Sequence, residues 1–375
     1  MFEKTGRLAR LLSSAEQIRG ELLSPKAAMV DAEARIPVET LAELWEQGFL
    51  SVLAPREFDG QGASLLEATL LIEEIARGCA STALLVVIQC LGTLPILIAA
   101  SPDQKEKWLK EIVHGRKLLA FALSEPEGDD PRETRAEREG EKFLLSGRKA
   151  FVTNAGEADW LVVFAATDPG AGLKSGISAF VLERGAAGLH LARTEPRLGL
   201  HGLPPADLVF DACAVNPDQM IGPLGQGYSL ADSALQPAGV LLAGLAVGLM
   251  QSAVDFLRED SALARLAANE AKSHPSEHLL AEIAMTLSAS RALTYRAAGA
   301  WEAGEGEFKL LSPQAKCLAT ESAVKVLQAA IELKGQTALL ADQPLSRLLR
   351  DAQCLPVLLR PNPSQRKAIA RTLMK

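Results

Sequence analysis

The sequence has no paired cysteine motif and no excess of positive charge. Its five cysteines are scattered along the chain, odd in number and without a C-x-x-C spacing. Such a pattern argues against a disulfide framework and a zinc site, and is typical of a protein in a reducing cytoplasm. Lys and Arg together number 39 against 46 Asp and Glu, a formal net charge of −7. We therefore expect a cytoplasmic protein with no metal site and no nucleic-acid partner.

Several motifs of common site classes are also incomplete. His274-Pro-Ser-Glu277-His278 matches the H-x-x-E-H metal pattern, but the segment looks like a helix entry rather than the continuous helix that pattern needs. The glycines of GPLGQG at 222–227 lack the strand–loop–helix frame of a dinucleotide site. Ser124 and Ser146 have no His or Asp partner at a recognisable spacing, so a hydrolase triad is not predicted.

The amino terminus has neither the apolar core nor the small-residue cleavage site of a signal peptide. Two uncharged runs, Cys79–Ser101 and Ser233–Val254, are each long enough to cross a bilayer, which takes about 20 residues. Gln89 and Pro95 interrupt the first run, and Pro237 lies near the start of the second. A helix that is apolar on all sides also suits a large core or a subunit contact. We therefore expect no membrane span.

The residue pattern changes twice along the 375 residues. Positions 1–118 show the helical spacing of apolar residues, 119–220 contain short strand-like runs, and 221–375 return to long helical patterns. We expect an α+β protein with an N-terminal α-helical domain at 1–118, a β-domain at 119–220 and a C-terminal α-helical bundle at 221–375.

The central stretch Phe121–Ala166 carries the most informative pattern. FALSEP is a short apolar run that Pro126 stops. KFLLSGRKAFVTN predicts two short strands about a Ser146-Gly147 turn, since glycine supplies the positive φ of tight hairpins. WLVVFAA predicts a third strand because β-branched and aromatic residues follow one another without a break.

In their order and spacing, these motifs resemble those of the acyl-CoA dehydrogenases. FALSEP, SGRKAFVTN and WLVVFAATD are similar to the family's (A/Y)xxTEPxAGSD, NGxKxWITN and a strand ending in TD. FLSVLAPREFDGQGAS upstream, and LGLHGLPPADLVFDACAV and RLLRDAQ downstream, extend the resemblance over nearly the whole chain. It implies an N-terminal all-α domain, a middle β-barrel or sandwich and a C-terminal four-helix bundle.

The resemblance also implies an FAD-dependent oxidoreductase. Family members remove two hydrogens from the Cα–Cβ bond of an acyl thioester: a Glu takes the α proton and flavin N5 accepts the β hydride. The expected partners are an acyl-CoA or acyl-carrier substrate and an electron-transfer partner, in a homotetramer or homodimer or together with a related subunit. Six positions match cofactor-binding positions of the family: Phe121, Leu123 and Ser124 lining the flavin, Phe151 against the isoalloxazine, Thr153 near N5 and Gly335 approaching the FAD.

The sequence departs from the family pattern at the base. The family's YEGTSQ aligns with LLRPNP at 358–363, which places Leu359 where the catalytic Glu is expected. An alternative base position of the family aligns near Ala238 and offers no carboxylate either. AGSD becomes EGDD, and the RxxFG of the neighbouring subunit is absent, with only Arg265 nearby. No catalytic residue is assigned, because a Leu cannot accept a proton.

Three functions therefore stay open. The chain is either an acyl-CoA dehydrogenase-like oxidoreductase with a displaced base, a non-catalytic partner subunit of a heteromeric dehydrogenase, or a flavin-dependent monooxygenase on the same fold, which needs no such Glu. Asp232 and Glu302 are carboxylates of the C-terminal region, but nothing in the sequence places them at the cleft.

Overall fold

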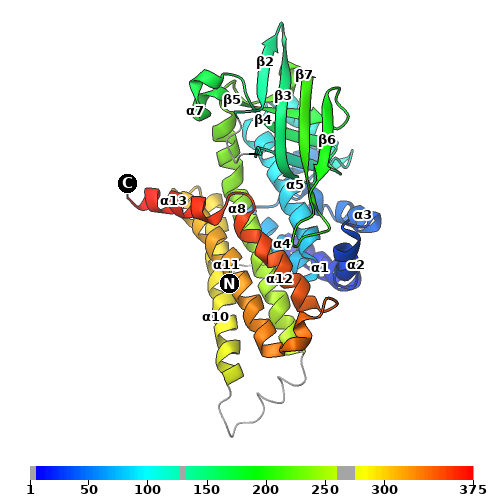
Figure 1. Ribbon diagram of the computed structural model, residues 1–375, viewed down its shortest axis with the longest axis vertical. Helices are drawn as coiled ribbons and strands as arrows, with labels where there is room; N and C mark the ends of the chain where they lie inside the picture. The colour runs from blue at the N-terminus through cyan, green and yellow to red at the C-terminus, as the bar shows by residue number, and fades with distance from the viewer. Residues whose placement is uncertain (1–5, 127–131, 260–274, 375) are drawn as a thin grey trace.

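A computed structural model describes residues 6–126, 132–259 and 275–374. A helical region, a β-domain and a second helical region follow one another along the chain, as the apolar periodicity predicts (Figure 1). The β-domain lies at one end of the molecule, and the long helices of the carboxyl-terminal half run away from it (Figure 1).

The N-terminal region consists of short helices around one buried helix. Its helices are α1 (Gly6–Ile18), continued by a π-helical turn (Arg19–Leu23), α2 (Ser24–Glu33), α3 (Val38–Glu46), α4 (Leu65–Gly78), α5 (Ala80–Ala99) and α6 (Pro102–Val113). Ser64 and Ser101 begin α4 and α6 with capping boxes, in which the side chain three residues later bonds back to the cap's N–H. Helix α5 and helix α8 (Gly227–Arg258) of the C-terminal region are each long and apolar enough to cross a membrane, but most of both helices is buried as core.

Helix α4 buries part of its polar side. An amphipathic helix ordinarily exposes its polar residues, yet Glu67 and Glu73 of α4 are both buried by packing from other helices. Glu67 pairs with Arg7. Glu73 accepts hydrogen bonds from Arg291 Nε at 3.0 Å and from the Tyr295 hydroxyl at 2.7 Å. Burial raises the pKa of Glu73 while Arg291 opposes the shift. The polar side of α4 is thus an internal contact between the two helical regions.

The β-domain is a curled sheet with a core of its own. Its strands are β1 (Leu119–Ala122), β2 (Arg135–Glu139), β3 (Lys142–Thr153), β4 (Trp160–Ala166), β5 (Ile177–Glu183), β6 (Leu189–Thr194), β7 (Pro205–Val215) and β8 (Met220–Ile221). Their order is β6-β7-β3-β2-β4-β5-β8, and β1 runs parallel to β4. Leu161 and Val163 of β4 point into the β-domain core, whereas Val162 and Phe164 join the helical core. Burial of both faces explains why WLVVFAA is apolar without alternation.

One expectation about this sheet is wrong. Ser146-Gly147 is not a hairpin turn, because β3 runs through it as a single strand of 12 residues. The pairing of β3 with β7 shifts between Leu145 and Gly147, which marks a bulge. A Cβ on Gly147 would lie 2.6 Å from the Thr134 Cα, so glycine is needed for the close approach of a neighbouring segment. The turn itself lies one strand earlier, where Gly140 has φ +61 between β2 and β3.

The C-terminal region is a bundle built on long helices. These are α8 (Gly227–Arg258), α10 (Pro275–Glu302) and α11 (Phe308–Lys334), followed by the shorter α12 (Pro344–Cys354) and α13 (Asn362–Leu373). Helix α8 also packs on α4 and α5, so the two helical regions share one core beneath the β-domain. His274 of the H-x-x-E-H pattern lies outside the described residues, and the described part of the chain contains no cluster of potential metal ligands.

Candidate functional site

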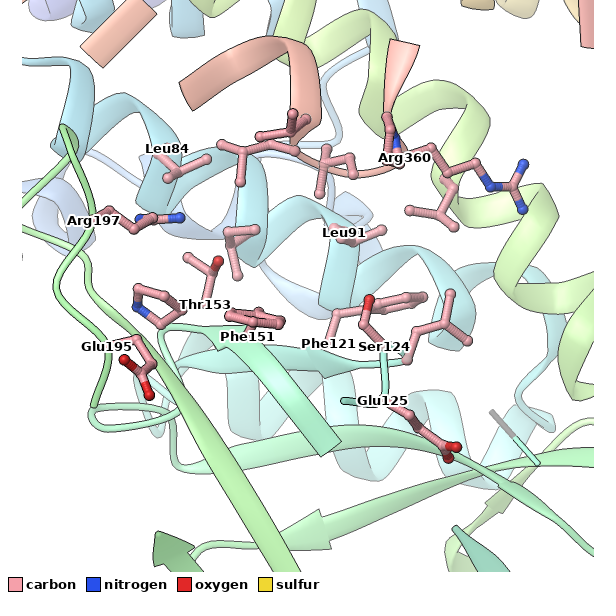
Figure 2. A pocket seen from close by; sticks show the side chains of 18 of the residues that line it. Leu84, Leu91, Phe121, Ser124, Glu125, Phe151, Thr153, Glu195, Arg197 and Arg360 are labelled. Carbon is pink, nitrogen blue, oxygen red and sulfur yellow. The ribbon is translucent and has the colours of Figure 1, made fainter. Parts of the chain in front are cut away.

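A cavity of about 520 Å³ lies where the β-domain meets the helices. Its floor is the end of β1 and β3, and its roof is formed by α5, α8 and the segment between α12 and α13 (Figure 2). Five of the six cofactor positions taken from the motifs line it together: Phe121, Leu123, Ser124, Phe151 and Thr153. The sixth, Gly335, does not: it ends α11 with φ +77, and the cavity wall does not include it.

A buried ion pair brings the two motif segments together. The backbone N–H of Ala150 donates to the Ser124 carbonyl at 2.9 Å, which joins the FALSEP segment to β3. Beside this bond, Lys149 Nζ donates to the Leu123 carbonyl at 3.0 Å and to Glu125 Oε1 at 2.7 Å. The side chains of Lys149 and Glu125 are 0% and 1% exposed. Sequence reasoning missed this pair, because Lys149 follows Arg148 in the strand and Glu125 is 24 positions away, so no local pattern marks either residue as buried.

A second bulge turns the Phe151 ring into the cavity. The pairing of β3 with β7 shifts between Lys149 and Val152, and Phe151 has φ +55, a conformation rare for a bulky side chain. Asp207 holds this backbone by accepting the Phe151 N–H at 3.1 Å, and it also pairs with Arg148 at 2.5 Å. The ring is 63% exposed, so the wall offers a flat aromatic surface next to the Thr153 hydroxyl (Figure 2).

The opposite wall is aliphatic. Leu84, Ile88 and Leu91 stand at helical spacing on one side of α5 and line the cavity. Leu84 and Leu91 lie across it from Phe151 (Figure 2). Leu235 from α8 and Leu358 from the segment after α12 complete this wall. Such a surface suits a hydrocarbon group, which it shields from water.

Leu359 lines the same cavity, on a segment with an unusual backbone. Leu359 has φ +57 and Arg360 has φ +135, both in the region that side-chain-bearing residues rarely adopt. The Arg360 guanidinium pairs with Asp232 of α8 at 2.6 Å. Asp232 therefore lies close to the cavity, and its carboxylate is paired with Arg360. Glu302 lies elsewhere, because its carboxylate accepts the Leu66 N–H at the start of α4.

Among the described residues, two further carboxylates line the cavity, Glu125 and Glu195. Glu125 is engaged by Lys149 and by the N–H groups of residues 133 and 134, each at 2.8 Å. Glu195 pairs with Arg193 at 3.0 Å, and its carboxylate points away from the centre of the cavity (Figure 2). Both carboxylates that line the cavity are therefore engaged by cations, Glu125 by Lys149 and Glu195 by Arg193.

Arg197 is a cation on the cavity wall that sequence reasoning also missed. Its guanidinium donates to the Leu203 carbonyl and reaches into the cavity beside Leu84 (Figure 2). Burial lowers the pKa of Arg197, and interactions with Cys354 and Asp351 oppose the shift. The cavity thus combines an apolar roof, an aromatic floor and two arginines, Arg197 and Arg360.

The chain is 34% identical over 357 residues to a probable acyl-CoA dehydrogenase, FadE25, of Mycobacterium leprae, covering 94% of this chain and 92% of that protein. It belongs to the acyl-CoA dehydrogenase family. Three family models match in succession: the N-terminal domain of acyl-CoA dehydrogenase at residues 8–116, the middle domain at 120–213 and the C-terminal domain at 225–374. This acyl-CoA dehydrogenase family member is therefore an oxidoreductase of the flavoprotein class.

Two further comparisons support the same family. A cyclohex-1-ene-1-carbonyl-CoA dehydrogenase of Geobacter metallireducens is 33% identical, over 94% of each chain. The solved structure of butyryl-CoA dehydrogenase from Megasphaera elsdenii superimposes with a TM-score of 0.92 at 27% identity, covering 100% of both chains. The expected fold is confirmed: an N-terminal helical domain, a middle β-domain and a C-terminal helical bundle.

Proposed function

We propose that this acyl-CoA dehydrogenase family member binds the flavin ring of FAD and an acyl thioester in the cavity, but lacks the family's catalytic base. The observation that carries the proposal is Leu359, an aliphatic side chain on the cavity wall at the position that the motif alignment gives to the base. The isolated chain is then a poor dehydrogenase of ordinary straight-chain acyl-CoA.

The described residues fit the ring system of a flavin. A flat apolar molecule can stack on the exposed Phe151 ring, because aromatic faces favour offset stacking. The hydroxyls of Thr153 and Ser124 lie on the same floor and are suited to the polar edge of such a ring (Figure 2). When bound, FAD would supply the acceptor for a hydride. Gly335 does not line this cavity and Arg265 lies outside the described residues, so only the ring system of FAD is assigned to the cavity.

The aliphatic roof supports the acyl part of the proposal. Leu84, Ile88 and Leu91 would contact a hydrocarbon chain and exclude water from it. The thioester would lie between this roof and the aromatic floor, where residue 359 faces it. Family membership supports an acyl-CoA or acyl-carrier thioester as the substrate class, and an electron-transfer protein as the partner.

The missing base matters because removal of a thioester α proton depends on it. A positioned general base contributes roughly 10²–10⁴-fold to the rate. Leu359 cannot supply it, and the cavity carboxylates Glu125 and Glu195 are held by Lys149 and Arg193. We therefore expect residual turnover at most.

The test compares wild type with Leu359→Glu, which installs a carboxylate, and with Leu359→Gln, which has a similar size and no base. All three are purified, their visible flavin spectra are recorded, and dehydrogenation of a series of acyl-CoA esters is followed with a dye acceptor. The proposal expects a yellow protein in each case and turnover only in Leu359→Glu. Robust steady-state turnover by wild type would refute the absence of a base.

Two other outcomes would assign the remaining functions. A colourless protein that becomes yellow only when co-expressed with a related chain would support a partner subunit of a heteromeric dehydrogenase. Product formation that requires oxygen and a flavin reductase would support a monooxygenase on the same fold.

A further inference from the structure

Lys316 is a fully buried lysine that hydrogen-bonds to the backbone of the segment that carries Leu359 in the cavity wall. It lies on α11, and its side chain is 0% exposed. Its ammonium donates to the Pro356 carbonyl at 3.0 Å, to the Arg360 carbonyl at 2.7 Å and to Asn362 Oδ1 at 2.7 Å. Two of the acceptors belong to the segment between α12 and α13, which carries Leu359, and the third, Asn362, is the first residue of α13. The ammonium thus uses its full donor capacity on this segment and on the helix start that follows it.

The segment needs such support because its backbone is strained. Leu359 and Arg360 both have positive φ, at +57 and +135. Residues held in such regions persist only where the surroundings determine their conformation. The carbonyls of Pro356 and Arg360 stand on either side of Leu359, so one ammonium holds the backbone before and after it.

The same contact is anchored on its far side. Asn362 Nδ2 donates to Glu321 Oε1 at 2.9 Å, and Arg366 binds both oxygens of Glu321 at 2.6 Å. Lys316 and Glu321 both lie on α11, so this helix contacts the start of α13 through two side chains, which bind Asn362 and Arg366. Burial lowers the pKa of Lys316 to about 8, whereas its three oxygen acceptors favour the charged form.

We propose that Lys316 is a positioning residue, which holds the segment Val357–Pro361 over the cavity in the conformation that presents residue 359 to a bound thioester. The functional half of this proposal rests on the proposed function, since a thioester must bind there for the presentation to matter. The structural half does not, because it concerns only where the segment lies.

The first test measures the mobility of the segment Val357–Pro361 with a spin label, and it requires neither bound flavin nor enzymatic turnover. Val357 is 63% exposed, and all five native cysteines are buried, so Val357→Cys provides a single reactive site for a nitroxide label. Leu339→Cys, also 63% exposed and outside the segment, provides the reference site. Each label is compared in three backgrounds: native, Lys316→Met, and Lys325→Met, which removes an exposed lysine of the same helix.

The expected result is a several-fold gain in label mobility at 357 in Lys316→Met, with no change at 339 and none in Lys325→Met. Unchanged mobility at 357 would overturn the proposal. An equal gain at both sites would also overturn it, since Lys316 would then be an ordinary core residue. If Lys316→Met does not fold, Asn362→Ala removes one acceptor and the link to Glu321; mobility at 357 should rise there too, and an unchanged value would contradict the proposal.

The second test measures kcat and KM in the Leu359→Glu background, with and without Lys316→Met. A base displaced by about 1 Å can lose roughly 10²-fold in rate, so adding Lys316→Met should lower kcat by about that factor with little effect on KM. An unchanged kcat would contradict the proposal that Lys316 positions residue 359 toward a bound thioester. If Leu359→Glu itself has no activity, the proposed function fails, while the label mobilities still decide whether Lys316 holds the segment.

Discussion

The buried pair of Lys149 and Glu125 offers a prediction whose size follows from the structure. Lys149→Met removes the hydrogen bonds to Glu125 and to the Leu123 carbonyl, and leaves a carboxylate that is 1% exposed without its cation. Breaking a buried pair in this way costs about 3–5 kcal/mol. Since about 1.4 kcal/mol is a factor of ten, amides of the surrounding strands should exchange roughly a hundred- to a few-thousand-fold faster.

Native-state hydrogen exchange of β1 and β3 is the assay, because it reports the opening of this sheet separately from the helices. Lys142→Met, an exposed lysine at the start of β3, is the control and should change little. In a Glu125→Gln background, which removes the charge and keeps an acceptor for the neighbouring N–H groups, Lys149→Met should cost at least about 0.5 kcal/mol less. Additive effects of the two substitutions would refute the assignment of a coupled pair.

Three further predictions concern other parts of the molecule. Phe151→Ala should weaken flavin binding by roughly 2- to 13-fold, the equivalent of about 0.5–1.5 kcal/mol of lost stacking, with the melting temperature nearly unchanged because the ring is exposed; unaltered affinity in a flavin titration would remove Phe151 from the site. Gly199→Ala should destabilise the protein by about 1–3 kcal/mol in urea unfolding, since its Cβ would lie 2.3 Å from the Arg350 backbone, whereas Gly306→Ala, with open space around it, should not. Burial raises the pKa of Asp351 from 3.8 to about 6, so its contribution to stability is present below pH 3.8 and is lost as the pH rises to about 6. Asp351→Asn should therefore raise the free energy of unfolding at pH 7 by up to about 3 kcal/mol and flatten its decline between those values; an unchanged pH profile would show that the carboxyl titrates normally.

The architecture was accessible from the sequence because it depends on patterns with a fixed period. Apolar spacing separates helices from strands, and the order of the motifs in Phe121–Ala166 indicates the family. The motif resemblance assigns Ser124 and Thr153 to one site, and both line the cavity. Their strands do not pair with each other, since β1 pairs with β4; the hydrogen bond from Ala150 to the Ser124 carbonyl joins the two segments instead. The Ser146-Gly147 error has a local cause: glycine serves a bulge against Thr134 as well as it serves a turn, and the sequence alone does not separate the two.

The supporting contacts of the site were not accessible, because their partners are distant along the chain. Lys149 and Glu125 are 24 positions apart, and Lys316 and Arg360 are 44 apart. A lysine in either element is more often solvated, so only packing shows that these two are buried. The positive φ of Phe151 is hidden for a similar reason, since Asp207, on another strand, holds it in place.

At residue 359, the backbone conformation and the chemical nature of the side chain can be considered separately. A Leu needs no special backbone to fill a hydrophobic wall, yet Leu359 and Arg360 are held in strained conformations at about 1–3 kcal/mol each. Three hydrogen bonds from Lys316 and the ion pair of Arg360 with Asp232 sustain that shape. We therefore infer that the backbone conformation of the segment between α12 and α13 directs the side chain of residue 359 into the cavity. A carboxylate placed at 359 would meet a backbone already positioned for it, which is why a single substitution is expected to reveal the proton-abstraction step.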